Sequence, residues 1–428
     1  MDRQLIFSHE VFFALLLRAF NLLATLLSTL LLARTLGPEA YGQYSQMMAI
    51  SMFLALPIQA GLPQLVVREI AMARAKFDSF LMKEIWGWSI MTTLVFSVIT
   101  GTLVLLLSPY WKIFGFTTSG MLVYLVGLPP LLALSATLTA ALRGTGKVLR
   151  GLISEFFMRP LAYNAFLLVD WLTTRQIEVQ EAIVYSIWAY FSSVAVALWF
   201  FSKILPIHSW FPSFSVGVPF RNWLKSILLF SLLEGSWVIL TQGSILLLSV
   251  LSGSESVANF KVTLQMASLA MIGFEVGGLV LAPRIARLWT LGRKHEIERI
   301  MVSAAKWTWW FNVLWVSLFL IYGHSLIFLA FGPEYLDAYS PLLILLLSNL
   351  VRSPVAFSAL FLNMSQKELY SALVTVLSAI VNLGVGYVLI PSFSVSGAAV
   401  ALGFSLALRY WILWTLSRKI LNTNGSSV

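Results

Sequence analysis

The sequence predicts an all-α polytopic membrane protein with twelve transmembrane helices. Of its 428 residues, 59% are hydrophobic and 11% are charged, whereas about a quarter of the residues in soluble proteins are charged. Apolar runs of the length that crosses a bilayer, ~20 residues, recur along the whole chain. Basic residues gather in every second segment between these runs. Together these observations predict a bundle of membrane-spanning helices.

The expected spans follow from the apolar runs in chain order. They cover residues 11–34, 43–67, 86–107, 120–142, 152–171, 182–205, 223–250, 258–283, 303–330, 341–362, 371–390 and 397–417. The first run is too long for the core of a signal peptide and is followed by no small-residue cleavage site. We therefore expect it to be retained as a span.

The basic residues predict the orientation of the spans. With a cytoplasmic N-terminus, the inside segments carry 20 Lys and Arg, whereas the outside loops carry only Lys112 and Arg175. The positive-inside rule therefore places both termini in the cytoplasm. The net charge of +10 follows from the same inside segments, so we expect no nucleic-acid partner.

The chain is expected to form two six-helix lobes, 1–205 and 223–428, joined by a cytoplasmic interfacial linker, 206–222. The linker combines three prolines with four aromatic residues. A weak repeat supports the division, because a shift of 216 residues aligns Gly37, Glu39, Tyr44 and Arg68 with Gly253, Glu255, Phe260 and Arg284. Six spans per half give parallel repeats, which transporters use to build a site between lobes.

Several kinds of chemistry have no candidate residues. The chain has no cysteine, and its four histidines lack metal-ligand spacing. Gly144–Lys147 resembles a phosphate loop but lacks the four-residue spacer and the hydroxyl after lysine. We therefore expect no metal, no cofactor and no catalytic residue.

The first expected span carries a polar stripe. Its members, Arg18, Asn21, Thr25 and Ser28, recur at helical spacing. An arginine near the centre of a span costs roughly 2.5–3.5 kcal/mol when it faces lipid, so Arg18 is expected to face protein, water or an anionic ligand. Alternatively, Arg18 snorkels towards the nearer membrane surface.

Three further arginines lie within expected spans: Arg159, Arg352 and Arg409. Arg352 shares a helical face with Asn349, so a role in a cavity competes with a structural ion pair or a backbone-carbonyl contact. Arg409 shares a face with Ser405 but is close enough to the inside end to snorkel. Arg159 follows Glu155 by four residues, and an i,i+4 ion pair is the preferred interpretation there.

Two acidic residues are candidates for coupling transport to protons or sodium. Glu234 shares a face with Ser231 and Thr241, and Glu275 shares one with Lys261. A carboxyl group buried in a span is neutral or has a cationic partner, and either state suits ion coupling. The alternative for each is a salt bridge between the lobes.

A polar stripe runs along the eleventh expected span. It contains Ser371, Thr375, Ser378 and Asn382. Such stripes more often pack helices together than bind ligands.

Four segments are similar to those of a known family: ARTLGPEAYGQYS (33–45), the inside loop that begins with Arg68 and Glu69, ALRGTGK (141–147) and FGPEY (331–335). They resemble the polysaccharide-transporter branch of the multidrug/oligosaccharidyl-lipid/polysaccharide (MOP) superfamily, the lipid-linked oligosaccharide flippases of bacterial O-antigen and capsule pathways. The resemblance also covers span count, loop lengths and topology.

The resemblance implies a V-shaped bundle with a central cavity in the bacterial cytoplasmic (inner) membrane. It implies translocation of an undecaprenyl-pyrophosphate-linked oligosaccharide by alternating access, with a polymerase or ligase of the same pathway as a possible partner. A diphosphate needs cations in a water-filled cleft. The expected substrate-binding residues are therefore Arg18, Asn21, Arg159, Arg352 and Arg409, with Glu234 and Glu275 for ion coupling.

Two other functions stay open. A cation-coupled drug antiporter of the same superfamily shares the architecture but depends on an acidic residue, Glu234 or Glu275, instead of arginine. A membrane glycosyltransferase or polymerase acting on the same lipid needs catalytic groups on sizeable outside loops. The outside loops of this chain have about a dozen residues at most, so we expect a transporter and not an enzyme.

Overall fold

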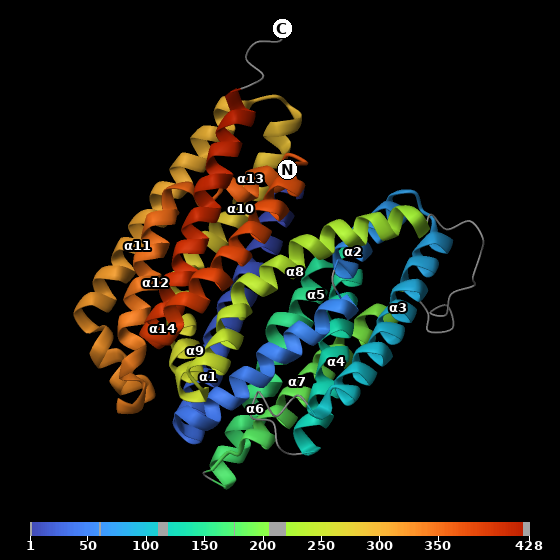
Figure 1. The fold of residues 1–428 in the computed structure, drawn as a ribbon. Coiled ribbons are helices and arrows are strands. Elements are labelled where there is room, and N and C mark those ends of the chain that lie inside the picture. Colours follow the sequence, from blue (N-terminus) through green and yellow to red (C-terminus); the bar gives the residue numbers. More distant parts are fainter. Residues whose placement is uncertain (1, 60, 110–118, 175, 205–219, 423–428) are drawn as a thin grey trace. The chain divides into compact units, whose positions relative to one another are not determined.

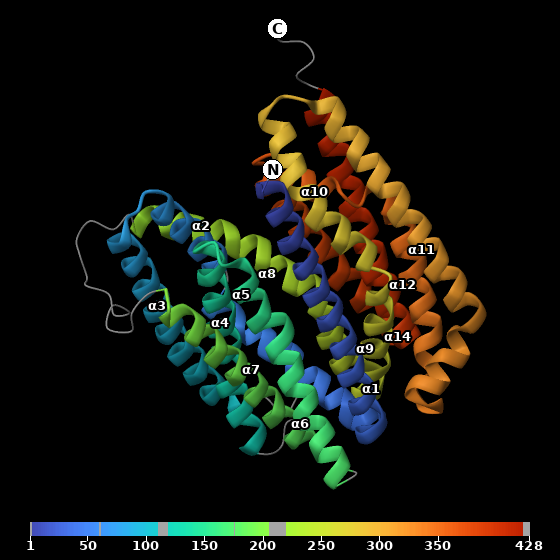
Figure 2. The same ribbon diagram turned by 180° about the vertical axis from the view of Figure 1, so that it is seen from behind.

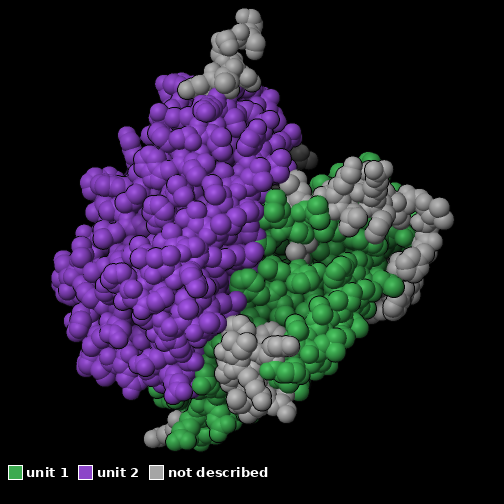
Figure 3. Space-filling view, viewed as in Figure 1, with its two compact units in different colours: residues 1–36, 43–235 green, residues 37–42, 236–428 purple. Residues whose placement is uncertain are grey.

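The computed structural model describes residues 2–59, 61–109, 119–174, 176–204 and 220–422 (Figures 1 and 2). The described chain divides into two compact units. Unit 1 contains residues 1–36 and 43–235, and unit 2 contains residues 37–42 and 236–428 (Figure 3). Most of the predicted linker, 206–222, lies outside the described residues.

The predicted all-helical membrane architecture is confirmed. Nine of the described helices are long and apolar enough to cross a membrane, or ten if the bent pair α9 (Ser254–Leu269) and α10 (Ile272–Thr290) forms one span. The exact number of twelve stays a prediction, as does the side of the membrane on which the termini lie.

Two of these helices are too long for one crossing. Helices α1 (Asp2–Gln59) and α14 (Glu368–Asn422) have 58 and 55 residues. At 1.5 Å per residue each would measure ~80 Å or more, against ~30 Å for the hydrocarbon core of a bilayer. Each is two helices merged across a kink, at the single non-helical residue Gly37 in α1 and Ser394 in α14.

Unit 1 is built around α4 (Ser119–Gly144), the most buried of the apolar helices. It packs against α2 (Leu62–Ala75), α3 (Ser79–Leu106) and α7 (Val179–Ser202). Their apolar faces form a core that contains Trp86 and Phe201, whose ring centroids lie 4.3 Å apart. The core also includes Trp223 of α8 (Phe220–Leu251).

The fifth predicted span of unit 1 is not a regular α-helix. It consists of α5 (Val148–Leu152), the π-helix η2 (Ile153–Met158) and α6 (Arg159–Thr173). Pro160 follows the π-helix and lacks the N–H that an α-helical hydrogen bond requires. Short π-helical turns within α-helices are frequent at functional sites.

Unit 2 places α12 (Tyr339–Arg352) against α14. The two helices approach closely, and Ser348 Oγ donates a 2.7 Å hydrogen bond to the carbonyl of Gly403. A second apolar core joins α10, α13 (Ser358–Met364) and the start of α11 (Lys294–Phe331) to the end of α14. The basic inside segment expected between the spans 258–283 and 303–330 is mostly helical, because α10 extends to Thr290 and α11 begins at Lys294.

Three turns share the sequence pattern Gly-x-Glu and the backbone conformation of its glycine. Gly37, Gly253 and Gly332 have φ values of 75°, 86° and 106° and ψ values of 172°, 175° and 173°. Each is followed two residues later by glutamate. This φ/ψ region is essentially restricted to glycine. The sequence repeat that relates Gly37 to Gly253 is therefore also a repeat of backbone conformation. A third copy of it lies at Gly332, before the 3-10 helix η4 (Pro333–Ala338).

Candidate functional site

Two buried arginines in unit 2 contact one aromatic ring. Arg352 at the end of α12 and Arg409 on α14 are 6% and 7% exposed. Their guanidinium carbons lie 5.2 Å and 5.1 Å from the centroid of the Tyr410 ring. Both distances lie within the range of cation–π attraction. The site thus brings together two of the predicted arginines around an aromatic residue that the sequence analysis did not select.

Neutral groups complete the surroundings of Arg352. Its Nε donates a 3.0 Å hydrogen bond to Asn349 Oδ1, which confirms that the two residues share a face. Its Nη2 lies 2.8 Å from Met271 Sδ. An uncharged amide and a thioether do not neutralise a guanidinium.

Arg409 also has neutral contacts. Its Nε donates to Thr375 Oγ1 at 2.9 Å, and its guanidinium lies 5.2 Å from the centroid of Trp237. Among the described residues, no carboxylate pairs with Arg352 or Arg409. Both guanidinium carbons lie within 5.2 Å of the centroid of the same ring, and two like charges this near to one another repel. The arrangement is therefore suited to an anion, which would compensate both charges.

Breaks in two helices position Arg352. Helices α9 and α10 meet at a bend of 50°, and Met271 lies at this bend. Helix α12 ends at Arg352 and continues as the 3-10 helix η5 (Ser353–Val355), which contains a proline. Arg352 and Met271, one at each break, are in contact with each other. Non-helical backbone at membrane depth is tolerated where it is buried in protein or lines a polar cavity.

A small pocket lies beside this contact. Asn312 Nδ2 donates to Ser353 Oγ at 3.0 Å, and Ser353 Oγ donates to the Asn349 carbonyl at 2.6 Å. The lining consists of Met271, Phe274, Thr308, Asn312, Asn349, Arg352, Ser353, Ala356 and Tyr410. Asn312 was not predicted as a site residue, although its i,i+4 spacing from Thr308 on an apolar helix was a usable signal.

Arg18 in unit 1 lies against the π-helix. Its guanidinium carbon is 5.4 Å from the ring centroid of Phe156, and the neighbouring rings of Phe20 and Phe157 are 4.8 Å apart. The polar stripe of α1 thus faces η2 and α6. Further along the stripe, Asn164 Nδ2 donates to the Ala24 carbonyl at 2.9 Å. Asn21 is half-buried on the same helix, and its carbonyl accepts from Thr25 Oγ1 at 2.7 Å.

The interpretation of Arg159 as the partner of Glu155 is wrong. Among the described residues no ion pair joins them, and Arg159 Nη1 instead donates to Tyr190 Oη at 3.3 Å, with the guanidinium 5.1 Å from the ring centroid. The i,i+4 rule holds for an α-helix. Residues 153–158 form a π-helix, whose wider turn changes the angular relation between positions 155 and 159.

A hydroxyl cluster in unit 1 was also missed. Tyr163 Oη donates to Tyr44 Oη at 2.8 Å, and Tyr44 Oη lies 3.1 Å from Ser186 Oγ. The three residues come from α6, α1 and α7. The cluster hydrogen-bonds these helices to one another, and no charge is involved.

The acidic candidates differ in their surroundings. Glu234 on α8 is half-buried, and its Oε1 accepts a 3.1 Å hydrogen bond from Gln64 Nε2. Glu275 is exposed in the first turn of α10. Lys261 and Glu275 lie on α9 and α10, which meet at a bend of 50°, so the two residues do not belong to one continuous helix.

The stripe on the eleventh span has two roles in unit 2. Asn382 Nδ2 donates to the Leu240 carbonyl and to Ser244 Oγ, each at 3.1 Å, and thereby packs α14 against α8. Thr375 contacts Arg409. One part of the stripe therefore joins helices, as expected, and another part belongs to the arginine site.

Comparison with known proteins identifies the family and the fold. The profile of the polysaccharide biosynthesis protein family matches residues 8–289. No curated protein matches the chain. Solved structures with a similar fold include an inward-facing multidrug resistance MATE family transporter of the MOP superfamily, with a TM-score of 0.77 and 13% identity over 95% of this chain and 96% of that one.

Two further structures with the same fold come from named organisms. A MOP superfamily transporter from Pyrococcus furiosus has a TM-score of 0.71 and 14% identity over 97% of this chain and 95% of that one. A mutant of a Vibrio cholerae MATE transporter has a TM-score of 0.66 and 15% identity over 99% of both chains. The similarity to these structures concerns the fold. The family match covers well over half of the chain, and the chain therefore belongs to the polysaccharide biosynthesis protein family.

Proposed function

We propose that the protein is a flippase that moves a polyprenyl-pyrophosphate-linked oligosaccharide across the bacterial cytoplasmic membrane by alternating access. The observation that carries the proposal is the pair of buried arginines, Arg352 and Arg409, beside one tyrosine ring and without a carboxylate partner among the described residues. Membership of a polysaccharide biosynthesis family points to the same class of cargo.

The chemistry of the cargo fits this pair. A pyrophosphate carries negative charges that hydrocarbon excludes. Guanidinium groups bind phosphate oxygens through two parallel N–H donors, and such charged hydrogen bonds are about twice as strong as neutral ones. Uncompensated charges on Arg352 and Arg409 make binding of an anion favourable where binding of a cation is not.

Transport by the purified protein tests the proposal. The protein is reconstituted into vesicles that carry a lipid-linked oligosaccharide, and exposure of the glycan on the opposite leaflet is followed with time. Arg352→Gln and Arg409→Gln should each slow translocation about tenfold or more, the effect of losing one charged hydrogen bond. The control is Arg299→Gln, which removes an exposed arginine of unit 2. Equal rates in vesicles with and without the protein would refute the proposal.

A cation-coupled drug antiporter is the second candidate function. The similar fold of MATE transporters and the hydrogen-bonded carboxyl group of Glu234 favour it. This function predicts that Glu234→Gln abolishes efflux of a cationic dye, whereas Arg352→Gln leaves efflux unchanged. The flippase predicts no dye efflux by the wild-type protein and a translocation rate that depends on the arginines.

Glycan extension by the purified protein would instead indicate the third class of function, a membrane glycosyltransferase or polymerase. The flippase proposal predicts that the glycan arrives on the opposite leaflet at its original length. A polymerase or ligase of the same pathway would act on it there.

A further inference from the structure

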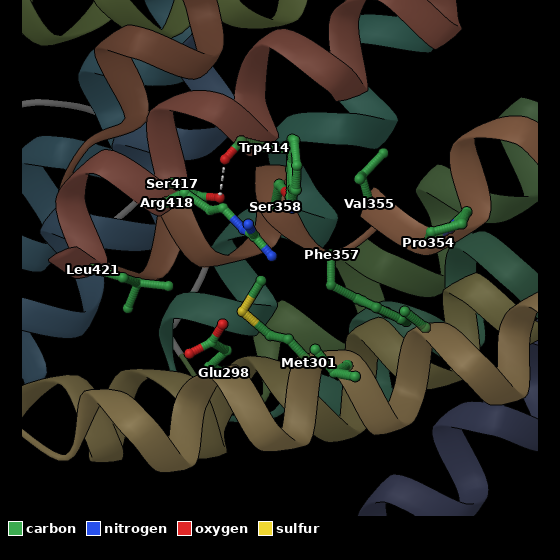
Figure 4. Close-up of a pocket in the computed structure, with 12 residues that line it drawn as sticks. Glu298, Met301, Pro354, Val355, Phe357, Ser358, Trp414, Ser417, Arg418 and Leu421 are labelled. Carbon is green, nitrogen blue, oxygen red and sulfur yellow. Dashed lines mark hydrogen bonds between the residues drawn. The ribbon is translucent and has the colours of Figure 1, made fainter.

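A second pocket in unit 2 lies apart from the arginine pair. It is formed by the first turns of α11, the junction of η5 with α13 and the last turns of α14 (Figure 4). It contains about 440 Å³ of space that is not filled by atoms, part of it open to solvent. Apolar side chains from all three segments form most of its wall: Met301, Val302, Val355, Phe357, Trp414 and Leu421.

Two opposite charges line this pocket without joining each other. Arg418 extends from α14 and Glu298 from α11 towards the same space (Figure 4). The Arg418 guanidinium carbon lies 4.5 Å from the ring centroid of Trp414. Within the described part of the chain, no ion pair links Arg418 to Glu298. A ligand that carries both charges would complement each of them.

A buried hydroxyl group also lacks a partner at this place. Ser358 lines the pocket and is 1% exposed, and its Oγ has no hydrogen-bond partner among the described residues. A buried polar group without a hydrogen bond is unfavourable. Ser417, which also lines the pocket, is satisfied, because its Oγ donates to the Trp414 carbonyl at 2.8 Å. The unpaired hydroxyl therefore marks a position where a ligand atom would accept or donate a hydrogen bond.

The residues along the two long helices place this pocket at the level of lipid headgroups. Helix α11 is charged from Lys294 to Arg299, whereas Trp307 and Trp310 are 77% and 63% exposed. Tryptophan is enriched where the membrane meets water. Helix α14 changes in the opposite sense, from an apolar run to Arg418 and Lys419. The pocket thus lies where both helices change from apolar to charged, with exposed apolar surface on the membrane side.

We propose that this pocket binds the headgroup of a zwitterionic phospholipid with a primary ammonium group, phosphatidylethanolamine in type. Arg418 and the hydroxyl of Ser358 donate to the phosphate oxygens, and the carboxylate of Glu298 accepts from the ammonium. The acyl chains lie along the exposed apolar face of α11 beyond Trp310. The site is independent of the transported cargo.

The carboxylate selects between classes of lipid. An anionic lipid such as phosphatidylglycerol satisfies Arg418 but brings a negative charge near Glu298. Phosphatidylcholine satisfies Arg418 but has no N–H to donate to Glu298. Only a headgroup with both a phosphate and an N–H-bearing cation satisfies both residues, so specificity arises from the two charges together.

Native mass spectrometry of the full-length protein in detergent tests the inference. The protein is incubated with equal amounts of phosphatidylethanolamine, phosphatidylcholine and phosphatidylglycerol, and the retained lipid is counted. Wild-type protein should retain phosphatidylethanolamine preferentially. Arg418→Gln should weaken this binding about tenfold, the effect of losing one charged hydrogen bond, whereas Arg418→Lys should restore much of it.

A change of preference makes the test specific. Glu298→Gln should abolish the preference for phosphatidylethanolamine over phosphatidylglycerol, because it removes the repelling carboxylate. Arg299→Gln, next to Glu298 but outside the pocket lining, should behave as wild type. Equal retention of the three lipids by wild-type protein, or the same loss in Arg299→Gln as in Arg418→Gln, would overturn the proposal. Full displacement by water-soluble glycerophosphoethanolamine at the same concentration would also overturn it, because no lipid would then be required.

Discussion

Aromatic rings hold the intramembrane arginines of this protein. Arg18 lies over Phe156, Arg159 lies over Tyr190, and Arg352 and Arg409 both contact the ring of Tyr410. A ring face attracts a cation and adds no negative charge. A guanidinium held in this way keeps its full charge for an anion, whereas one locked to a carboxylate does not.

Replacing the shared ring tests this view of the arginine pair. Tyr410→Leu removes two cation–π contacts, and we expect the free energy of unfolding to fall by about 1–4 kcal/mol. Thermal unfolding in detergent measures the loss. The matched control is Tyr322→Leu, which changes an exposed tyrosine of the same unit. Equal melting temperatures for the two variants would show that the ring does not stabilise the arginines.

The four arginines were predictable from sequence, but their partners were not. A charged residue inside an apolar run can be recognised from the sequence alone. The free-energy cost of exposing it to lipid indicates that it faces protein, water or a ligand instead. The identity of that partner depends on contacts between distant segments, such as Met271 with Arg352 and Tyr190 with Arg159. Tyr410 was within reach, because it is adjacent to Arg409 in the chain.

At the scale of elements, the Gly-x-Glu turns join long helices by a conformation that other residues avoid. Gly37 and Gly253 have nearly the same φ and ψ, and a Cβ at either would meet no atom within 4 Å. The requirement for glycine there comes from the backbone alone. Gly42, which follows Gly37 on α1, requires glycine for a different reason: a Cβ at this position would lie 1.8 Å from the carbonyl oxygen of Ser254.

The backbone requirement can be measured separately from packing. Gly253→Ala should destabilise the protein by about 1–3 kcal/mol, the cost of holding a non-glycine residue in this region. Gly384→Ala is the control, because Gly384 is helical and also has no atom within 4 Å of an added Cβ. We expect the control to melt at or above the wild-type temperature, since alanine favours a helix. A similar fall in both variants would contradict the backbone explanation.

The apolar runs predicted where helices lie but not where they break. A hydropathy pattern reports burial in lipid and is the same for a straight helix and for a broken one. The π-helix before Arg159, the bend at Met271 and the 3-10 turn after Arg352 therefore went unrecognised. Pro160 and Pro354 were visible signals at two of these places, because proline removes a backbone donor. Each break adjoins an arginine of the candidate site or one of its contacts.

At the scale of the whole molecule, the two units carry arginines of different character. Those of unit 1 lie beside a π-helix, and those of unit 2 lie where two helices break. An anionic cargo that leaves a negatively charged cytoplasm gains about 2.3 kcal/mol per charge for each 100 mV of membrane potential. Arginines that moved with the cargo would cancel part of this gain. The net free energy that the membrane potential gives to the proposed flippase therefore depends on how far the arginines move.

The orientation of the chain in the membrane can be tested by labelling introduced thiols. The chain has no cysteine, so a single introduced thiol gives an unambiguous label. Asp337 is exposed on η4, in an expected outside loop, and Lys367 is exposed between α13 and α14, in an expected inside segment. A membrane-impermeant maleimide added to intact cells stripped of their outer wall should label Asp337→Cys and leave Lys367→Cys unlabelled. Inside-out vesicles should give the reverse pattern. Because 20 basic residues lie in the expected inside segments against two outside, losing Lys367 leaves the charge bias intact. Labelling of Lys367→Cys in intact cells would therefore invert the assignment of every loop.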